Sequence, residues 1–228
     1  MRLPTTPVRS RFGAVARPRG ARARADEVRA RLTQEYPDAE CALVHDDAFQ
    51  LLTATILSAQ TTDENVNKVT PALFAKYPTP ADLAHADPAD VEQLVFATGF
   101  YRSKTKNLLG MARMVDDEFD GEVPTELDDL VRLPGVGRKT ANVVRSVGFD
   151  LPGLPVDTHV GRLARRLKLT TEDDPVKAEL DLNVLVPPAE RGRFSLRLIL
   201  HGRRVCFARK PNCAGCVLVD LCPSADPT

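Results

Sequence analysis

Residues 133–144 read LPGVGRKTANVV, in which two glycines stand two positions apart before an arginine, a lysine and an apolar run. Segments with helical spacing flank the glycines, residues 125–131 before them and a run starting at Arg138 after them, so the stretch is predicted to be a short hairpin between two helices. Glycine lets the backbone approach a partner closely, and the free N–H groups at a helix start bind anions. The stretch therefore predicts a phosphate site, although a tight helix turn without a ligand uses the same glycines.

Lys139 stands in the first turn of the second helix, where the helix dipole disfavours a cation. The same field favours the free amine, which is the form that a nucleophile needs. A carboxylate would complement this amine, and Asp157 in LPVDTHVGRLARRL begins the next helix. Asp157 is equally suited to be a plain N-cap. Lys139 and Asp157 are nevertheless the candidate catalytic pair.

Helical periodicity covers most of the chain, and no convincing strand pattern is present. Apolar residues recur every three or four positions in residues 26–36, 47–59, 63–76, 101–119, 138–147, 158–167 and 175–186. Many short helices joined by tight Pro/Gly turns predict an all-α fold.

Helix start signals agree with these segments. Thr79-Pro80 and Asp87-Pro88 each pair a capping side chain with a proline at the first helical position. We expect Asp63, Thr125 and Asp157 to cap their helices as well. Pro71 is expected to kink or split the segment 63–76.

Composition points to a globular protein. The chain has 228 residues, of which 43% are hydrophobic and 27% charged. No apolar run approaches the roughly eighteen residues of a membrane helix, and the N-terminus lacks the apolar part of a secretory signal. We expect a soluble protein of the cytoplasm, with no membrane partner.

Charge is unevenly distributed, although the net charge is zero. Residues 1–31 carry nine arginines and two acidic residues, so the rest of the chain must be equally acidic. Residues 1–23 are expected to form a disordered basic arm, with an organelle transit peptide as the alternative. Residues 132–168 and 191–210 are also basic, and the three stretches together would form a phosphate-binding surface.

Four of the five cysteines lie within the last 23 residues, at Cys206, Cys213, Cys216 and Cys222. In a reducing cytosol, thiolates this close in sequence are typical of one metal centre. Tetrahedral sulfur suits both zinc and iron–sulfur clusters, and the single C-x2-C with longer flanking gaps favours iron–sulfur. The remaining Cys41 is expected to be a small buried side chain.

Several motifs together resemble the endonuclease III family, whose members are helix-hairpin-helix DNA glycosylases with DNA lyase activity. They are LSAQTTDENVNK, LPGVGRKTANVV, VDTHV, LILHGRRVC and the C-x6-C-x2-C-x5-C tail, and the resemblance runs from about residue 24 to 222. It implies a two-part all-α protein with DNA in the cleft between the parts. Residues 41–151 would form a helical barrel, and residues 24–40 with 152–228 would hold a [4Fe-4S] cluster on the four cysteines, leaving 1–23 as the arm.

The resemblance also implies roles for individual residues. Lys139 would be the nucleophile and Asp157 the catalytic carboxylate, and Gln60 would fill the gap left by a flipped base. Phe100 stands where the family commonly has an aliphatic wedge, which leaves the opposite-strand preference open. The other residues implied to meet DNA are Leu133, Gly135, Gly137, Arg138, Arg209 and Lys210.

The function implied is base-excision DNA repair. The enzyme would remove oxidised pyrimidines as a DNA glycosylase and cleave abasic sites as a lyase, through β-elimination from a lysine Schiff base. It would act as a monomer on damaged double-stranded DNA of the nucleoid. One alternative is an adenine-mismatch glycosylase, which would lack a lysine at Lys139 and carry a further domain after Cys222. The other is a non-catalytic iron–sulfur protein that binds DNA or senses redox state.

Overall fold

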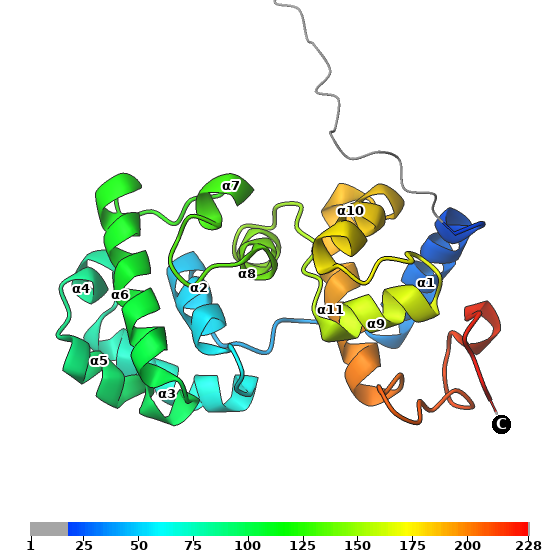
Figure 1. Ribbon diagram of the computed structural model, residues 1–228, viewed down its shortest axis with the longest axis horizontal. Helices are drawn as coiled ribbons and strands as arrows, with labels where there is room; N and C mark the ends of the chain where they lie inside the picture. Colours follow the sequence, from blue (N-terminus) through cyan, green and yellow to red (C-terminus); the bar gives the residue numbers. More distant parts are fainter. Residues whose placement is uncertain (1–17, 228) are drawn as a thin grey trace, which may run out of the picture.

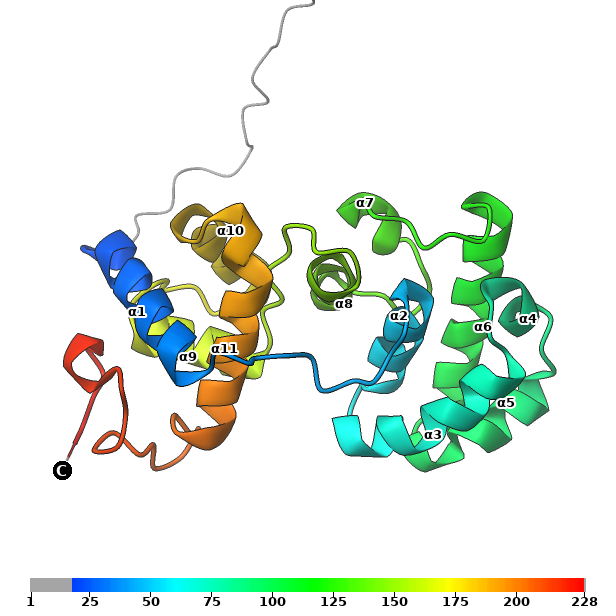
Figure 2. The ribbon, with the colours of Figure 1, turned by 180° about the vertical axis from the view of Figure 1, so that it is seen from behind.

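A computed structural model describes residues 18–227, and every regular element in that part of the chain is helical. The helices form two lobes side by side (Figures 1 and 2). The barrel lobe comprises α2 (Ala48–Leu57), α3 (Asp63–Lys76), α4 (Pro80–Ala84), α5 (Pro88–Val95), α6 (Tyr101–Glu118), α7 (Leu127–Leu130) and α8 (Arg138–Val143). The cysteine lobe comprises α1 (Ala21–Glu35), α9 (Thr158–Arg166), α10 (Pro175–Leu185), α11 (Arg191–Arg204) and the loop that carries the four cysteines. The predicted all-α, two-part architecture is confirmed.

The barrel lobe has its own apolar core. Leu52, Leu108 and Met111 are completely buried there, and Leu73 and Val91 pack with them. Each large aliphatic side chain removed from water in this way contributes roughly 1.5–3 kcal/mol. The core supports α8, which lies on the side of the lobe that faces the other half of the molecule (Figure 1).

The cysteine lobe has a separate core, built by both ends of the chain. Val28 and Leu32 of α1 pack with Leu163, Leu182 and Phe194 from α9, α10 and α11. The chain therefore enters this lobe first, builds the barrel lobe and returns. The two cores agree with the predicted division into two parts, while its boundaries at residues 24–40, 41–151 and 152–228 remain a prediction.

Several local predictions need correction. Thr62 rather than Asp63 caps α3, because the Thr62 hydroxyl accepts the Asn65 N–H at 3.2 Å. Glu126 rather than Thr125 precedes α7, and its side chain makes no capping bond. Pro71 does not split the segment, because α3 is one helix on both sides of the proline and Val66 and Leu73 hold it against the core; the predicted kink remains a prediction.

The N-terminal boundary also differs from the prediction. Helix α1 starts at Ala21, so the last three residues of the predicted arm are helical, and Ala21 and Ala25 pack into the cysteine lobe. Residues 1–17 of the predicted arm lie outside the described residues. The sequence predicts residues 191–210 only as a basic stretch, whereas the structure forms helix α11 there; the many arginines mask the apolar spacing of Phe194 and Leu198, which are buried. Between residues 18 and 227, no helix has the length and apolarity needed to cross a bilayer.

Candidate active site

The glycine-rich hairpin links α7 to α8. Gly135 adopts a left-handed conformation with φ of 80°, and a Cβ atom there would lie 2.9 Å from Cβ of Asn107, so only glycine fits. No atom lies within 4 Å of the Cβ position of Gly137, which leaves the backbone open to a partner. Helix α8 begins at Arg138, so its first N–H groups have no partner within the helix. The hairpin has the geometry of an anion site.

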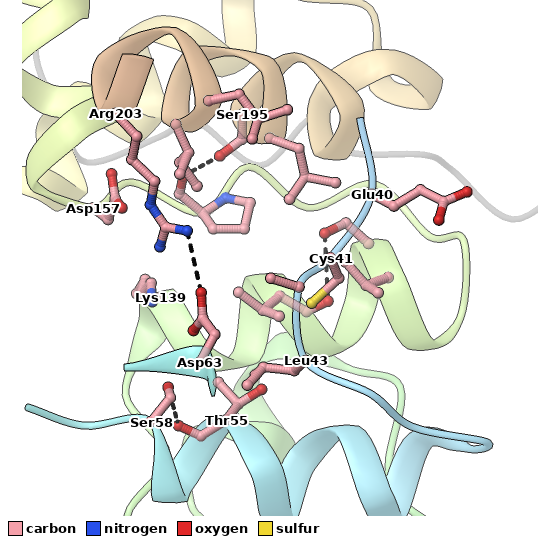
Figure 3. Close-up of a pocket in the computed structure, with 18 residues that line it drawn as sticks. Glu40, Cys41, Leu43, Thr55, Ser58, Asp63, Lys139, Asp157, Ser195 and Arg203 are labelled. Carbon is pink, nitrogen blue, oxygen red and sulfur yellow. Dashed lines mark hydrogen bonds and ion pairs between the residues drawn. The ribbon is translucent and has the colours of Figure 1, made fainter. Parts of the chain in front are cut away.

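Lys139 and Asp157 line the same cavity between the lobes (Figure 3). The cavity measures about 110 Å³. Lys139 is exposed in the first turn of α8, whereas Asp157 is partly buried at the start of α9. One Asp157 oxygen caps α9 by accepting the Val160 N–H at 2.8 Å. The structure thus brings the candidate catalytic pair together, and their chemical roles remain a prediction.

An ion pair crosses the cavity between the lobes. Nη1 of Arg203 on α11 lies 3.1 Å from Oδ2 of Asp63 on α3 (Figure 3). Sequence reasoning assigned Asp63 only a capping role and Arg203 only a place in a basic stretch. Both residues stand in motifs that resemble the family, LSAQTTDENVNK and LILHGRRVC, and this was the one sign in the sequence that they matter. The ion pair between them could not be predicted, because it forms only where the two lobes meet.

The segment that joins the lobes between α1 and α2 forms another wall of the cavity. Glu40 and Cys41 lie there, opposite Thr55 and Ser58 of the barrel lobe (Figure 3). Burial raises the pKa of the Cys41 thiol, which favours its protonated form. Cys41 is expected to be a small buried side chain; it is partly buried against the core of the barrel lobe, and it also lines this cavity.

Gln60 and Phe100 are both exposed and both adopt left-handed backbone conformations, with φ of 55° and 47°. Such conformations are costly for residues other than glycine and persist where the surroundings hold them. The amide of Asn65 provides one such restraint, since it donates to Thr61 Oγ1 and to the Ala97 carbonyl and so joins the two loops.

Lys104 provides a second restraint on the Phe100 loop. Only 4% of this lysine is exposed, and its Nζ donates to the Thr98 carbonyl at 2.7 Å. Burial lowers the pKa of Lys104. These hydrogen bonds fix the backbone of the loop, while the Phe100 side chain is 67% exposed to solvent.

Many of the arginines expected on a phosphate-binding surface contact the protein itself. Arg22 and Arg24 donate to backbone carbonyls of α10 and of the end of α9, and Arg31 pairs with Asp220. Arg138 donates two hydrogen bonds to Glu179, and these raise the pKa of its guanidinium. Arg209 and Lys210 are exposed in the cysteine loop.

The four cysteines surround one small cavity of about 30 Å³ in the C-terminal loop. In the part of the chain that the structure describes, no three His, Cys, Asp or Glu side chains are gathered as a site for one metal ion. Four thiols around a common space are the donor set that an iron–sulfur cluster requires. Cys206, Cys213, Cys216 and Cys222 therefore fit such a cluster as its ligands.

Two side chains outside the loop direct N–H groups or ring nitrogens at these sulfurs. Arg166 Nη1 lies 3.1 Å from Cys206 Sγ, and His201 Nε2 lies 3.2 Å from Cys216 Sγ. Burial lowers the pKa of His201 to about 4. Hydrogen bonds of this kind fix ligand orientation and tune a metal centre.

Comparison with known proteins decides the family. Residues 53–188 match the model of the HhH-GPD superfamily base excision DNA repair proteins, and residues 206–222 match the iron–sulfur binding domain of endonuclease III. The chain is 53% identical to endonuclease III of Synechocystis sp. over 203 residues, which cover 89% of this chain and 93% of that protein. The chain belongs to the endonuclease III family.

Other family members show the same similarity. Endonuclease III of Escherichia coli strain K12 is 38% identical over 86% of this chain and 93% of its own length. A solved structure of a trapped endonuclease III–DNA covalent intermediate superposes with a TM-score of 0.84 at 42% identity, covering 89% of this chain and 96% of that one. A thermostable thymine-DNA glycosylase, at 23% identity and a TM-score of 0.80, shares the fold.

Membership confirms the predicted class of function and the predicted cofactor. The protein is a base-excision DNA repair enzyme of the glycosylase and abasic-site lyase class. Its C-terminal loop is an iron–sulfur domain, and the cofactor is a [4Fe-4S] cluster. When bound, the cluster cross-links the loop through iron–sulfur bonds.

Proposed function

We propose that this enzyme removes oxidised pyrimidines from double-stranded DNA and cleaves the resulting abasic site with Lys139 as nucleophile. The observation that carries the proposal is the shared cavity, which places an exposed amine and a carboxylate from different lobes around one space. Lys139 follows directly on the glycine-rich hairpin, which has the geometry of an anion site. A phosphate bound by the hairpin would hold the adjoining deoxyribose close to the Lys139 amine, as a reaction at the sugar requires.

The chemistry proceeds on a nucleotide turned out of the helix, because the sugar C1′ atom is inaccessible inside the base stack. Lys139 Nζ bonds to C1′ while the damaged base leaves with the electrons of the glycosidic bond. The Asp157 carboxylate stabilises the positive charge on the sugar and assists proton transfer. Sugar opening gives an iminium, loss of the C2′ proton expels the 3′ phosphate, and the strand is cut.

DNA would lie across both lobes. Leu133, Gly135 and Gly137 would present the hairpin backbone to a phosphate, and Arg209 and Lys210 would contact phosphates from the cysteine loop. Gln60 and Phe100 would enter the duplex beside the flipped nucleotide, because both are exposed and held in strained loops. An aromatic wedge can stack on the unpaired opposite base. The enzyme would act as a monomer in the cytoplasm, on DNA of the nucleoid.

Borohydride trapping tests the nucleophile. Reduction of the Schiff base should link the wild-type protein covalently to duplexes that contain an abasic site or one oxidised pyrimidine. Lys139→Gln should give no trapped complex, yet bind a duplex with a tetrahydrofuran abasic analogue as the wild type does. Lys76→Gln is a matched control, since Lys76 is an exposed lysine paired with Asp90 on the same lobe.

An undiminished trapped complex with Lys139→Gln would show that another amine attacks. Duplexes that each contain one defined lesion establish the substrate class. Rapid release of oxidised pyrimidines is expected, and release of mismatched adenine alone would favour the adenine glycosylase alternative.

A further inference from the structure

A buried carboxylate of the cysteine lobe binds α8, the helix that carries Lys139. Glu179 on α10 of the cysteine lobe has a side chain that is only 5% exposed. Its oxygens accept both Nε and Nη2 of Arg138 on α8, at 2.7 and 2.9 Å. Arg138 precedes Lys139 directly, so this two-point contact fixes the turn of α8 that carries the nucleophile. Bidentate arginine–carboxylate pairs constrain geometry as well as distance.

The same carboxylate also acts, through Asn142, on the segment that leads to Asp157. Glu179 Oε2 accepts the side-chain N–H of Asn142 at 3.0 Å, and Asn142 is 3% exposed. The amide oxygen of Asn142 accepts the backbone N–H of Leu154 at 3.2 Å. Gly153 packs so tightly on Asn142 that a Cβ there would lie 2.6 Å from the Asn142 carbonyl oxygen. These contacts fix residues 153 and 154, which lead to Asp157, against α8.

Stability alone does not account for this arrangement. A buried ion pair contributes little net stability, because the desolvation of both charges offsets most of their attraction. Helix α10 also carries a second buried carboxylate, Asp181, which accepts the Thr170 hydroxyl at 2.6 Å within the same lobe. Glu179 also accepts a longer bond, at 3.4 Å, from Asn183 of its own helix, but it differs from Asp181 because Arg138 and Asn142 of α8 in the other lobe donate to it as well.

We propose that Glu179 is a positioning residue, which holds Lys139 and Asp157 at their reacting separation through Arg138 and Asn142. The inference rests on the proposed function of Lys139 and Asp157. It assigns the Arg138 side chain to holding α8, so that the hairpin backbone rather than this guanidinium meets the phosphate. Displacement of a reacting group by about 1 Å can cost about 10²-fold in rate, so a contact that touches no substrate can control catalysis.

Two amide substitutions in α10 test the proposal. Glu179→Gln keeps the shape but sets an amide N–H against the N–H groups of Arg138, and Asp181→Asn makes the equivalent change at the other carboxylate. Single-turnover cleavage of an abasic duplex is compared with affinity for the tetrahydrofuran analogue, at a temperature where circular dichroism shows both variants folded. We expect Glu179→Gln to slow cleavage by about 10- to 100-fold at unchanged affinity, and Asp181→Asn to keep the wild-type rate.

Equal rates for the two variants would overturn the proposal, whether both are slow or both match the wild type. The wild-type protein is trapped by borohydride in the same experiment. Absence of trapping in the wild type contradicts the proposed function, whereas a normal wild type with an unaffected Glu179→Gln contradicts the positioning role alone.

Arg138→Met provides a second variant in case Glu179→Gln does not fold, because the Arg138 side chain is 35% exposed. If Arg138 holds α8, this variant slows cleavage while DNA affinity and its salt dependence stay unchanged. Weaker binding with a salt slope reduced by about one would identify Arg138 as a phosphate contact and overturn the proposal. When the two residues act as one unit, the double variant Arg138→Met/Glu179→Gln is no slower than the slower single variant.

Discussion

The two lobes each contribute one member of the candidate catalytic pair, but they are held together differently. The barrel lobe, which carries Lys139, depends on a continuous apolar core from Leu43 to Val144. The cysteine lobe, which carries Asp157, has a helical core and then a long C-terminal loop in which Leu218 is the only fully apolar side chain buried beyond α11, within the described residues. Apart from Leu218, the loop is attached by polar contacts and by side chains that are only partly buried, such as Val217, Leu221 and three of its cysteines.

Polar contacts of Arg166 illustrate how the loop is attached. Its guanidinium donates to the carbonyls of Phe207 and Ala208, at 2.7 and 3.0 Å. Net hydrogen bonds of this kind contribute only about 1 kcal/mol each, since water offers the same partners to the unfolded chain. The loop therefore needs its cluster to stay ordered, whereas the barrel lobe needs only its apolar packing. The difference predicts that one lobe can lose structure without the other.

The largest effect is expected from loss of a cluster ligand. Cys213→Ser should lose the cluster and order in the loop, because a structural metal centre contributes folding energy directly. The purified variant should be colourless and bind DNA weakly, while the barrel lobe retains its amide protection in hydrogen exchange. The wild type should be yellow-brown with about four irons per chain. Retained affinity and an unchanged loop in the variant would contradict the comparison between the lobes.

A smaller effect is expected from apolar truncations in the two regions. Leu108→Ala in the barrel core should lower the free energy of unfolding by about 2–5 kcal/mol, because it leaves a cavity. Leu218→Ala should mainly speed iron release to a chelator, since Leu218 belongs to the same apolar cluster as the predicted ligands Cys216 and Cys222. Denaturant unfolding and chelator kinetics on both variants measure the two effects. If Leu108→Ala speeds iron release as much as Leu218→Ala, the lobes do not respond independently.

The smallest effect on the fold is expected from a change at Asp157, the carboxylate that the cysteine lobe contributes to the cavity. Asp157→Asn should keep the α9 cap, since an amide oxygen can still accept the Val160 N–H. Base removal should nevertheless fall by ~10²-fold or more, the scale on which catalytic electrostatics act. Single-turnover base release measures this loss, with iron content and thermal unfolding as controls. A wild-type rate would show that Asp157 only caps its helix, so that this lobe supports the reaction without taking part in it.

Local sequence determined much of the outcome. Periodicity and caps predicted most helices, because a helix start depends on side chains within one turn, as at Thr79 and Asp157. The hairpin glycines were also readable, since Gly135 needs a conformation that other residues rarely adopt. Cysteine spacing predicted the metal centre because all four candidate ligands lie in one short segment, residues 206–222.

Tertiary structure alone decided which distant residues share the cavity. Asp63 and Arg203 stand 140 positions apart, and Arg138 and Glu179 stand 41 apart, so no local pattern relates them. It also decided which arginines remain free, because Arg31 and Arg138 are paired with carboxylates from other parts of the chain. A sequence motif determines the local conformation of its own segment. Contacts between the lobes depend instead on how two separate cores pack, and no single segment determines their relative placement.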